Sequence, residues 1–346
     1  MNRRVTIQDI ADALGVSRNT VSKAINNSEG IADSTREKIL QKAVEMGYKQ
    51  FSYVSSLVSL SSFKNDTPEI GGEVAMLTSK ILGKSHFASM MIDKIHEELA
   101  QIGYTLSFHH VSEKNVQSLT FPKTFHPDRI AAVICSEVFD LAYCDMICNS
   151  GIPVLFLDGP ARNGRRSVNA DMLMMDNRTE IMSFVDHMLE RNLTKIGFIG
   201  DRSHCQSFWE RHAAFRAAMK IAEVHVEDKF IIDYPDNTPE LLRERITQMD
   251  EYPDVFICAN DFVAIDAMRA LAEKDRSLLK KVRFLGFDDS HESRIVYPAL
   301  STVHIHSQAM AFSALHLLMT RIKEPDMEYR TIYVETNLVL RESTEF

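Results

Sequence analysis

The chain has few cysteines, and their pattern does not match a disulfide framework. It contains five, at positions 135, 144, 148, 205 and 258, an odd number with irregular spacing. Small secreted domains depend on paired cysteines, so this pattern argues against that class. Cys144 and Cys148 lie one helical turn apart, but no matching His/Cys pair follows, which argues against a zinc site. We expect free, buried thiols in a reducing cytoplasm.

Long apolar runs are also absent. Segments such as Ile130–Cys135 and Ile152–Leu157 extend for six residues, whereas a membrane-spanning helix needs roughly 18 or more. Arg3 and Arg4 lead directly into the first predicted helix, which leaves no apolar core for a signal peptide. These features predict a cytoplasmic protein without a membrane partner.

Familiar catalytic and cofactor patterns are missing as well. The run Gly83–Ser85 resembles the end of a phosphate-binding loop, but Thr78 stands where that loop needs its first glycine. Neither the Gly-x-Ser-x-Gly elbow nor the His-Glu-x-x-His pair occurs. His304 and His306 alternate along one predicted strand without a third ligand. We therefore predict no enzyme activity, no cofactor and no metal.

Positive charge gathers at the N-terminus although the chain as a whole is acidic. The net charge of the 346 residues is −9. Residues 1–64 hold nine Lys/Arg and six Asp/Glu, a balance of +3, whereas the remainder carries −12. This asymmetry indicates that contact with nucleic acid is confined to the N-terminal segment.

The segment Thr6–Asn26 has the pattern of two short helices joined by a tight turn. Thr6, with Asp9 three residues later, matches a capping box, and Gly15 follows the last apolar position of the first helix. Ser17 is placed to cap the second helix. A capped helical hairpin with a solvated polar face is the alternative. The agreement of caps, turn and packing residues favours a DNA-binding helix-turn-helix.

The polar face of the second helix carries side chains suited to DNA. Arginine and lysine match guanine edges, asparagine matches adenine, and hydroxyl groups match phosphates. The predicted DNA-binding residues of this segment are Thr6, Ser17, Arg18, Asn19, Thr20, Ser22, Lys23 and Asn26.

A third helix and a polar linker follow. The helix is expected to begin near residues 33–34 and to end at Gly47, which completes a three-helix headpiece over residues 1–48. Residues 49–69 are rich in serine, which favours turns over helix interiors. We expect a hinge or linker there, with one short helix around Ser52–Ser59.

From residue 70 onward, apolar strands alternate with amphipathic helices. Runs such as Glu73–Thr78 and Lys195–Gly200 are largely apolar, as in parallel sheets covered on both faces. The length favours an α/β body of two doubly wound lobes, with a ligand cleft at the carboxyl ends of the strands. The predicted lobes are about 70–172 with 304–330, and about 173–303 with 331–346.

The order of these segments resembles the lactose-repressor (LacI/GalR) family of bacterial transcription regulators. In the headpiece the resemblance rests on Val5–Asn26, followed by Ser34–Leu40 and Gly47-Tyr48. In the body it rests on short runs in family order, namely GIPVLFLD, KIGFIG, WERHAAF, CANDFVAIDAMRAL, LGFDD, PALSTV and LVLREST. Each body run alone is weak, but their order and spacing over nearly the whole chain are specific.

The resemblance implies a homodimer with two headpieces on a pseudo-palindromic operator in double-stranded DNA. It implies a body similar to periplasmic sugar-binding proteins, with three crossovers between the lobes and a small effector that changes operator affinity. The expected effector is a sugar or sugar phosphate, and the expected function is repression of a carbohydrate-use operon. Two alternatives stay open: control by a protein co-regulator, and a sugar-processing enzyme with a fused headpiece.

Residue by residue, the resemblance assigns base reading to Arg18 and Asn19, and a minor-groove wedge to Leu57. Such a wedge kinks the DNA at a flexible step. The chain departs from the family pattern at Gln50–Phe51 and Val54. Packing of Leu57 against the body is therefore the alternative.

For the effector cleft, the resemblance assigns polar side chains at strand ends. A carboxylate and a guanidinium together hold sugar hydroxyls well, and a ring such as Phe87 or Trp209 can stack on the sugar. Asp261 has the alternative role of capping the helix that follows it. Ile305 stands where the family has glutamine, which points to a different ligand. The assigned residues are Phe87, Ser89, Asp158, Ser207, Arg211, Asn260, Asp261 and Asp288.

Overall fold

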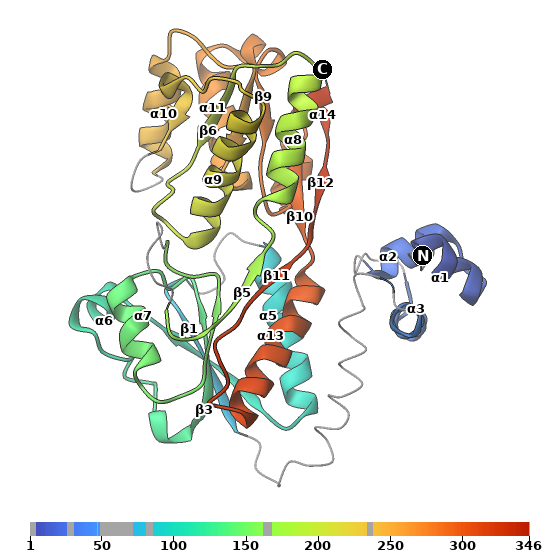
Figure 1. Cartoon of the computed structure of the whole chain (residues 1–346), viewed down its shortest axis with the longest axis vertical. Coiled ribbons are helices and arrows are strands. Elements are labelled where there is room, and N and C mark those ends of the chain that lie inside the picture. Colours follow the sequence, from blue (N-terminus) through green and yellow to red (C-terminus); the bar gives the residue numbers. More distant parts are fainter. Residues whose placement is uncertain are drawn as a thin grey trace.

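Three N-terminal helices and a body of two lobes make up the fold (Figure 1). The computed structural model describes residues 5–25, 31–46, 48, 72–80, 86–161, 168–233 and 238–345. Asn26, Gly83–Ser85 and the linker with Leu57 lie outside the described residues.

The headpiece forms because local capping signals and one apolar stripe per helix agree. Its helices are α1 (Ile7–Leu14), α2 (Arg18–Ile25) and α3 (Asp33–Glu45). The capping box of Thr6 and Asp9 is present, and Gly15 ends α1 at φ 66°, a left-handed conformation that suits glycine. The predicted cap and turn of the first helix are therefore confirmed. The shared core is formed by Ile10, Ala11, Val21, Ala24, Ile25, Ile39 and Ala43.

The first lobe is built on a six-stranded parallel sheet in the order β11-β5-β4-β3-β1-β2. Its strands are β1 (Glu73–Thr78), β2 (Thr105–His110), β3 (Ile130–Ser136), β4 (Val154–Leu157), β5 (Asp171–Met175) and β11 (Thr331–Val334). Its helices are α5 (His86–Gln101), α6 (Glu113–Ser118), η2 (Pro127–Arg129), α7 (Leu141–Cys148) and α13 (Ser307–Lys323).

Side chains of β1 alternate between two cores, which shows that both faces of this sheet are covered. Val74 and Met76 belong to the cluster that includes α5 and α13, whereas Ala75 and Leu77 belong to the cluster that includes α7. Burial on both faces explains why the strand is apolar throughout rather than alternating.

The second lobe has a four-stranded parallel sheet in the order β7-β6-β8-β9. Its strands are β6 (Ile196–Ile199), β7 (Ile231–Ile232), β8 (Val255–Cys258) and β9 (Arg283–Leu285). Its helices are α8 (Thr179–Glu190), α9 (Gln206–Ile221), η3 (Asp228–Phe230), α10 (Pro239–Gln248), α11 (Asp261–Lys274), η4 (Arg276–Lys280), α12 (His291–Ile295) and α14 (Glu342–Glu345). Both sheets reverse their strand order once, so each has a switch point at its carboxyl edge.

The predicted lobe boundaries are wrong at two places. Strand β11 pairs with β5 in the first lobe, whereas the sequence predicts residues 331–346 in the second. Strand β10 (Thr302–Ile305) pairs antiparallel with β12 (Thr336–Val339), so the boundary predicted at 304 cuts a two-stranded ribbon. A short apolar strand belongs to the sheet in which it finds its pairing partner, and that partner lies far away in sequence.

Cysteine burial fits the expectation from sequence. All five cysteines are free, and four of them are buried. Burial raises the pKa of Cys148 to about 12 and that of Cys144 further, so the thiolates that would react are disfavoured. Among the described helices, none combines the length and apolar character needed to span a membrane.

Candidate DNA interface and interlobe site

Helix α2 presents the predicted base-reading side chains on its outer face. Arg18, Asn19 and Lys23 are exposed, whereas Val21 and Ala24 are buried against the other helices. The spacing puts the two groups on opposite faces of one helix. The outer face is therefore polar, cationic and open to a partner.

Hydrogen bonds hold the start of this helix. Ser17 Oγ accepts from the backbone N–H of Thr20 at 3.0 Å, as a helix cap does. Thr6 Oγ1 lies 2.7 Å from the Asp9 carboxylate, so its hydroxyl serves the cap of α1. Thr20 and Ser22 are half-buried beside the exposed set.

Three acidic residues follow the carboxyl ends of strands in the body. Glu137 follows β3, Asp158 follows β4, and Asp288 lies after β9. Their φ angles are 57°, 64° and 115°, in the region that L-residues rarely adopt. Such strained backbone is found most often at functional sites, where the surrounding structure maintains it. We name these residues, together with Arg211, the interlobe cluster.

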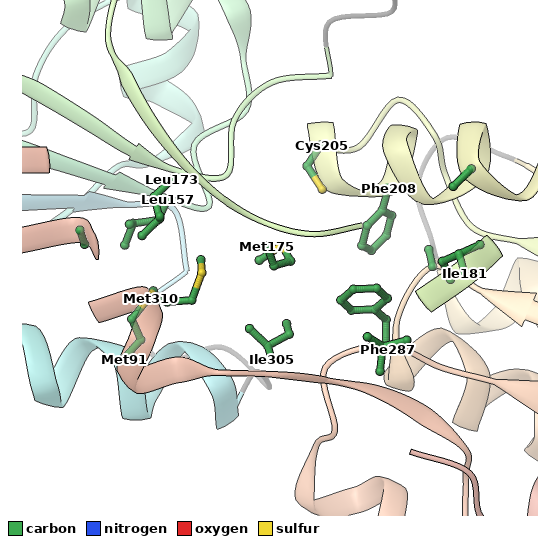
Figure 2. Packing of buried hydrophobic residues seen from close by; sticks show 14 of the residues in the cluster. Met91, Leu157, Leu173, Met175, Ile181, Cys205, Phe208, Phe287, Ile305 and Met310 are labelled. Atoms are coloured by element: carbon green, nitrogen blue, oxygen red, sulfur yellow. The ribbon is translucent and has the colours of Figure 1, made fainter. Parts of the chain in front are cut away.

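Arg211 on α9 is the cation of this cluster and is 2% exposed. Its Nε donates to Asn177 Oδ1 at 2.9 Å, and its Nη1 donates to the Ala259 carbonyl at 2.6 Å. The guanidinium lies 3.5 Å from the centre of the Phe287 ring, and its Nη1 is 3.9 Å from Asp288 Oδ1. Phe287 and its neighbours form an apolar core around Met175 and Ile305 (Figure 2).

Burial sets the charge state of the acids near Arg211. Burial raises the pKa of Asp288 to about 8; Arg211 opposes the rise, and the carboxylates of Asp261, Glu137 and Asp158 add to it. The pKa of Asp158 is also raised by burial. Four acids and one buried arginine thus lie within electrostatic range of one another.

The cap of helix α11 is Asn260, and not Asp261 as the alternative interpretation had it. Asn260 is the cap of α11, because its side chain accepts from the Val263 N–H at 2.9 Å. Asp261 is the first residue of that helix and is fully buried, accepting from Thr302 Oγ1 at 2.5 Å and from Ser290 N at 2.7 Å. The capping role considered for Asp261 is therefore wrong, and its carboxylate holds two neighbouring segments together.

The two lobes touch directly at Asp158. The backbone N–H of Ser207 on α9 donates to Asp158 Oδ1 at 3.2 Å, and the N–H of Gln206 donates to the Gly159 carbonyl at 2.8 Å. An acid of the first lobe therefore caps a helix of the second lobe, where the helix dipole favours negative charge. Ser207 itself is buried, with Oγ 3.2 Å from Met175 Sδ.

Phe87, Ser89 and Trp209 were the remaining residues assigned to the effector cleft or considered for stacking on the sugar. The side chains of Phe87 and Ser89 lie outside the described residues, although their backbone is in α5. Trp209 lines a hollow of about 670 Å³ together with Arg202, His212 and Asp233, among others. The stacking role considered for Phe87 and Trp209 stays a prediction.

His304 and His306 each bond to a different partner. His304 Nδ1 lies 2.9 Å from Asp289 Oδ2, and His306 Nε2 lies 2.7 Å from Asn337 Oδ1. Burial lowers the pKa of His306 to about 4, so this side chain is neutral near pH 7. Among the described residues, no group of three or more His, Cys, Asp or Glu has the geometry to hold a metal.

Sequence reasoning missed a buried polar relay next to Arg211. Asn177, fully buried between β5 and α8, accepts from Arg211 and donates to Glu210 Oε2 at 3.1 Å. Glu210 Oε1 in turn accepts from the Tyr333 hydroxyl at 2.9 Å. The feature of the sequence that could have indicated this relay is the polar pair Asp176-Asn177, directly after an apolar strand. The relay joins Arg211 to two of the segments that cross between lobes.

It also missed an aromatic contact across the lobes. The rings of Phe139 in the first lobe and His204 in the second lie 5.2 Å apart, edge to face. His204 is in turn 5.1 Å from Phe208. No pattern in the sequence links two loops that lie 65 positions apart.

Comparison with known proteins agrees with this arrangement. A model of bacterial regulatory proteins of the lacI family matches residues 6–50, and a model of the periplasmic binding protein-like domain matches residues 185–344. The HTH-type transcriptional repressor PurR of Mannheimia succiniciproducens is 27% identical over 348 residues, with 98% of each chain covered. PurR of Vibrio parahaemolyticus is 25% identical over 344 residues, again with 98% coverage of both chains.

Solved structures share the fold over the whole chain. The complex of the transcriptional regulator CelR with cellobiose has a TM-score of 0.67 at 21% identity, covering 98% of this chain and 100% of that one. The lac repressor dimer bound to operator and the anti-inducer ONPF has a TM-score of 0.65 at 18% identity, with 99% of each chain covered. The chain therefore carries a lacI-family helix-turn-helix domain at its N-terminus and a periplasmic-binding-protein-like domain behind it.

Proposed function

We propose that this protein is a transcriptional repressor that reads a specific DNA operator through α2 and responds to a small molecule bound between its lobes. The exposed row of Arg18, Asn19 and Lys23 on a capped, well-packed helix carries the first half of this proposal. Side chains of this kind at the start of a recognition helix reach base edges in the major groove. As a regulator of cytoplasmic DNA, it acts by binding and not by catalysis.

The interlobe cluster supports the second half. Asp158 of the first lobe and Asp288 of the second are half-buried acids at the carboxyl ends of parallel strands, where such sheets bind ligands, and the buried Arg211 of α9 lies beside them. A sugar-like effector that engages them replaces contacts that now run between the lobes. The operon controlled would then be one for carbohydrate use.

Dimerisation is part of the proposal, because two headpieces on a pseudo-palindromic operator need a two-fold axis. Two large apolar side chains at the end of α12 support it. Ile295 is 70% exposed and Tyr297 is 83% exposed. Apolar groups exposed side by side mark surfaces that partners cover.

A selection from random double-stranded DNA tests the proposal. The full-length protein should enrich a sequence with two inverted half-sites, and its affinity for that sequence should fall steeply with salt while remaining far above its affinity for unrelated DNA. If the enriched DNA molecules shared no sequence, and selected and unrelated DNA were bound with the same salt dependence, operator recognition would be ruled out.

A further inference from the structure

A hollow in the second lobe lies on a different face of α9 from the interlobe cluster. Arg211 of this helix belongs to the cluster, whereas Trp209 and His212 line the hollow. Its volume is about 670 Å³, which is within the range of small-molecule sites. The residues that line it are distinct from those of the cluster. They are Asp201, Arg202, Ser203, Trp209, His212, Ala213 and Asp233.

Two segments that follow neighbouring strands supply the charged part of the hollow. Arg202 comes after β6 and Asp233 comes after β7, which pair in the parallel sheet. The backbone N–H of Arg202 donates to Asp233 Oδ1 at 3.1 Å, and its Nε donates to Asp233 Oδ2 at 2.7 Å. These bonds hold the guanidinium through Nε. Among the described residues, none accepts from its two Nη groups, so these donors are available to a ligand.

The two aromatic side chains of the hollow lie three positions apart on α9 and are therefore neighbours on its surface. The imidazole of His212 packs edge to face against Phe198, with ring centres 5.1 Å apart. Burial lowers the pKa of His212 to about 4, although Asp233 opposes this shift, so the ring is neutral near pH 7 and can donate one hydrogen bond and accept another. Within the described part of the chain, neither this imidazole nor the indole N–H of Trp209 has a hydrogen-bond partner.

Each charged group of the hollow already has a protein partner. Asp233 pairs with Arg202, and Asp201 accepts from the backbone N–H and the hydroxyl of Ser203 at 2.8 and 2.5 Å. The groups left over are mostly donors, which a protonated amine cannot use because it has no acceptor. An anion could accept from them but would lie beside two carboxylates. Uncharged hydroxyl groups, which both donate and accept, fit this set.

We propose that this hollow is a second ligand site, apart from the interlobe cluster, and that it binds an uncharged sugar ring. The apolar C–H face of such a ring lies on the indole of Trp209, and its hydroxyl groups accept from Arg202 and bond to His212. Ala213, one helical turn after Trp209, has a small side chain that leaves room for the ring. A free monosaccharide and the terminal ring of a longer saccharide share this chemistry.

The fluorescence of Trp209 tests the proposal, because it is the only tryptophan among the 346 residues. The full-length protein is titrated with D-glucose, D-galactose, D-mannose and the disaccharide maltose, and we expect at least one of them to shift the emission in a saturable way. Saturation by a monosaccharide would make the free sugar the ligand, and saturation by maltose alone would make it a longer saccharide. The 2-amino and 6-phosphate forms of a monosaccharide that binds should bind about tenfold more weakly than their parent.

Two variants connect the signal with the hollow. Arg202→Gln removes the guanidinium, and His212→Phe removes the ring nitrogens but keeps an aromatic ring against Phe198. Each should weaken binding about tenfold. Arg269→Gln is the matched control, because Arg269 on α11 also pairs with an aspartate at the surface, at 3.4 Å. Its affinity should equal that of the wild type, and thermal melts verify that all three variants fold.

Three results would overturn the proposal. The first is an emission that none of the four sugars changes, and the second is a charged form that binds more tightly than its neutral parent. The third is a signal that is as strong in Arg202→Gln and His212→Phe as in the wild type, because the sugar would then bind elsewhere. The DNA selection described above uses no sugar, so the test of operator recognition stands whatever the result here.

Discussion

At the scale of single residues, the proposed DNA-reading residue Arg18 and the proposed effector-site residue Arg211 lie in opposite environments. Arg18 is exposed and loses little solvation until it meets DNA, whereas Arg211 is buried and depends on the protein for each of its contacts. Substitution of an exposed reader changes binding alone, whereas substitution in the buried cluster also changes stability.

Replacement of Arg18 tests the base-reading role. We expect Arg18→Ala to weaken binding to the selected operator by about 1–3 kcal/mol and to relax preference at one base pair of each half-site. Lys38→Ala, an exposed basic residue of α3, is the control and should leave base preference unchanged. Binding that falls equally for all operator variants would show that Arg18 contacts only phosphate.

Replacement of Asp288 tests the charge state of the cluster. In the folded protein its pKa is about 8, against about 4 in an unfolded chain. The folded state therefore keeps a proton that the unfolded state releases, and stability falls as pH rises from about 4 to 8.

Asp288→Asn should remove this part of the pH dependence. Each unit of pKa difference corresponds to about 1.4 kcal/mol, so the variant should gain a few kcal/mol relative to the wild type between pH 5 and pH 8. Urea unfolding at the two pH values measures the difference. If the free energy of unfolding fell equally with pH in both proteins, Asp288 would be ionised in the folded state.

At the scale of elements, one buried ion pair joins three parts of the first lobe. Asp171 begins β5 and is fully buried, and Arg321 on α13 is 4% exposed. The two side chains are joined by bonds of 3.1 Å, and the N–H of Arg330, next to β11, donates to the same carboxylate at 2.7 Å. The pair sets the position of β11 beside β5 more than it adds stability.

Removal of Arg321 should nevertheless be costly, because the buried charge of Asp171 loses its closest cation. We expect Arg321→Met to lower the free energy of unfolding by about 3–5 kcal/mol. The control is Lys195→Met, which breaks the exposed pair with Glu251 and should cost about 1 kcal/mol or less. Circular dichroism during urea unfolding gives the free energy of unfolding of both variants. Equal losses of stability would contradict the structural role given to the Asp171–Arg321 pair.

At the scale of the whole molecule, the proposed control of operator binding by an effector requires that the lobes and the protomers of the proposed dimer move together. Within one chain the lobes are linked through the contact of Asp158 with α9 and through the relay of Asn177, Glu210 and Tyr333. In the proposed mechanism, an effector that engages Asp158 or Arg211 competes with these contacts, and this competition couples lobe geometry to effector occupancy.

A charged substitution at the proposed dimer surface tests the assembly. Tyr297→Asp should convert a dimer into monomers at micromolar concentration and reduce operator affinity, since one headpiece reads only one half-site. Ile221→Asp, at a position that is 72% exposed on α9, should remain dimeric. Analytical ultracentrifugation gives the masses, and a dimer that survives Tyr297→Asp would place the interface elsewhere.

Local patterns along the chain were sufficient to predict the headpiece and the class of the body. The cap at Thr6, the turn at Gly15 and the buried stripe with Val21 depend on neighbours within a few positions, so local patterns reveal them. Uninterrupted apolar strands between amphipathic helices indicated parallel sheets for the same reason. The family resemblance then located Asp158, Arg211 and Asp288 along the chain.

The contacts that these residues make were not predictable from local patterns, because they form only in the folded chain. The tertiary structure assigned β11 to the first lobe, made Asp158 the cap of a helix in the other lobe, and connected Arg211 to Asn177. Each of these depends on contacts between segments tens to more than a hundred positions apart. Such contacts are selected by packing of the whole chain, which no local pattern encodes.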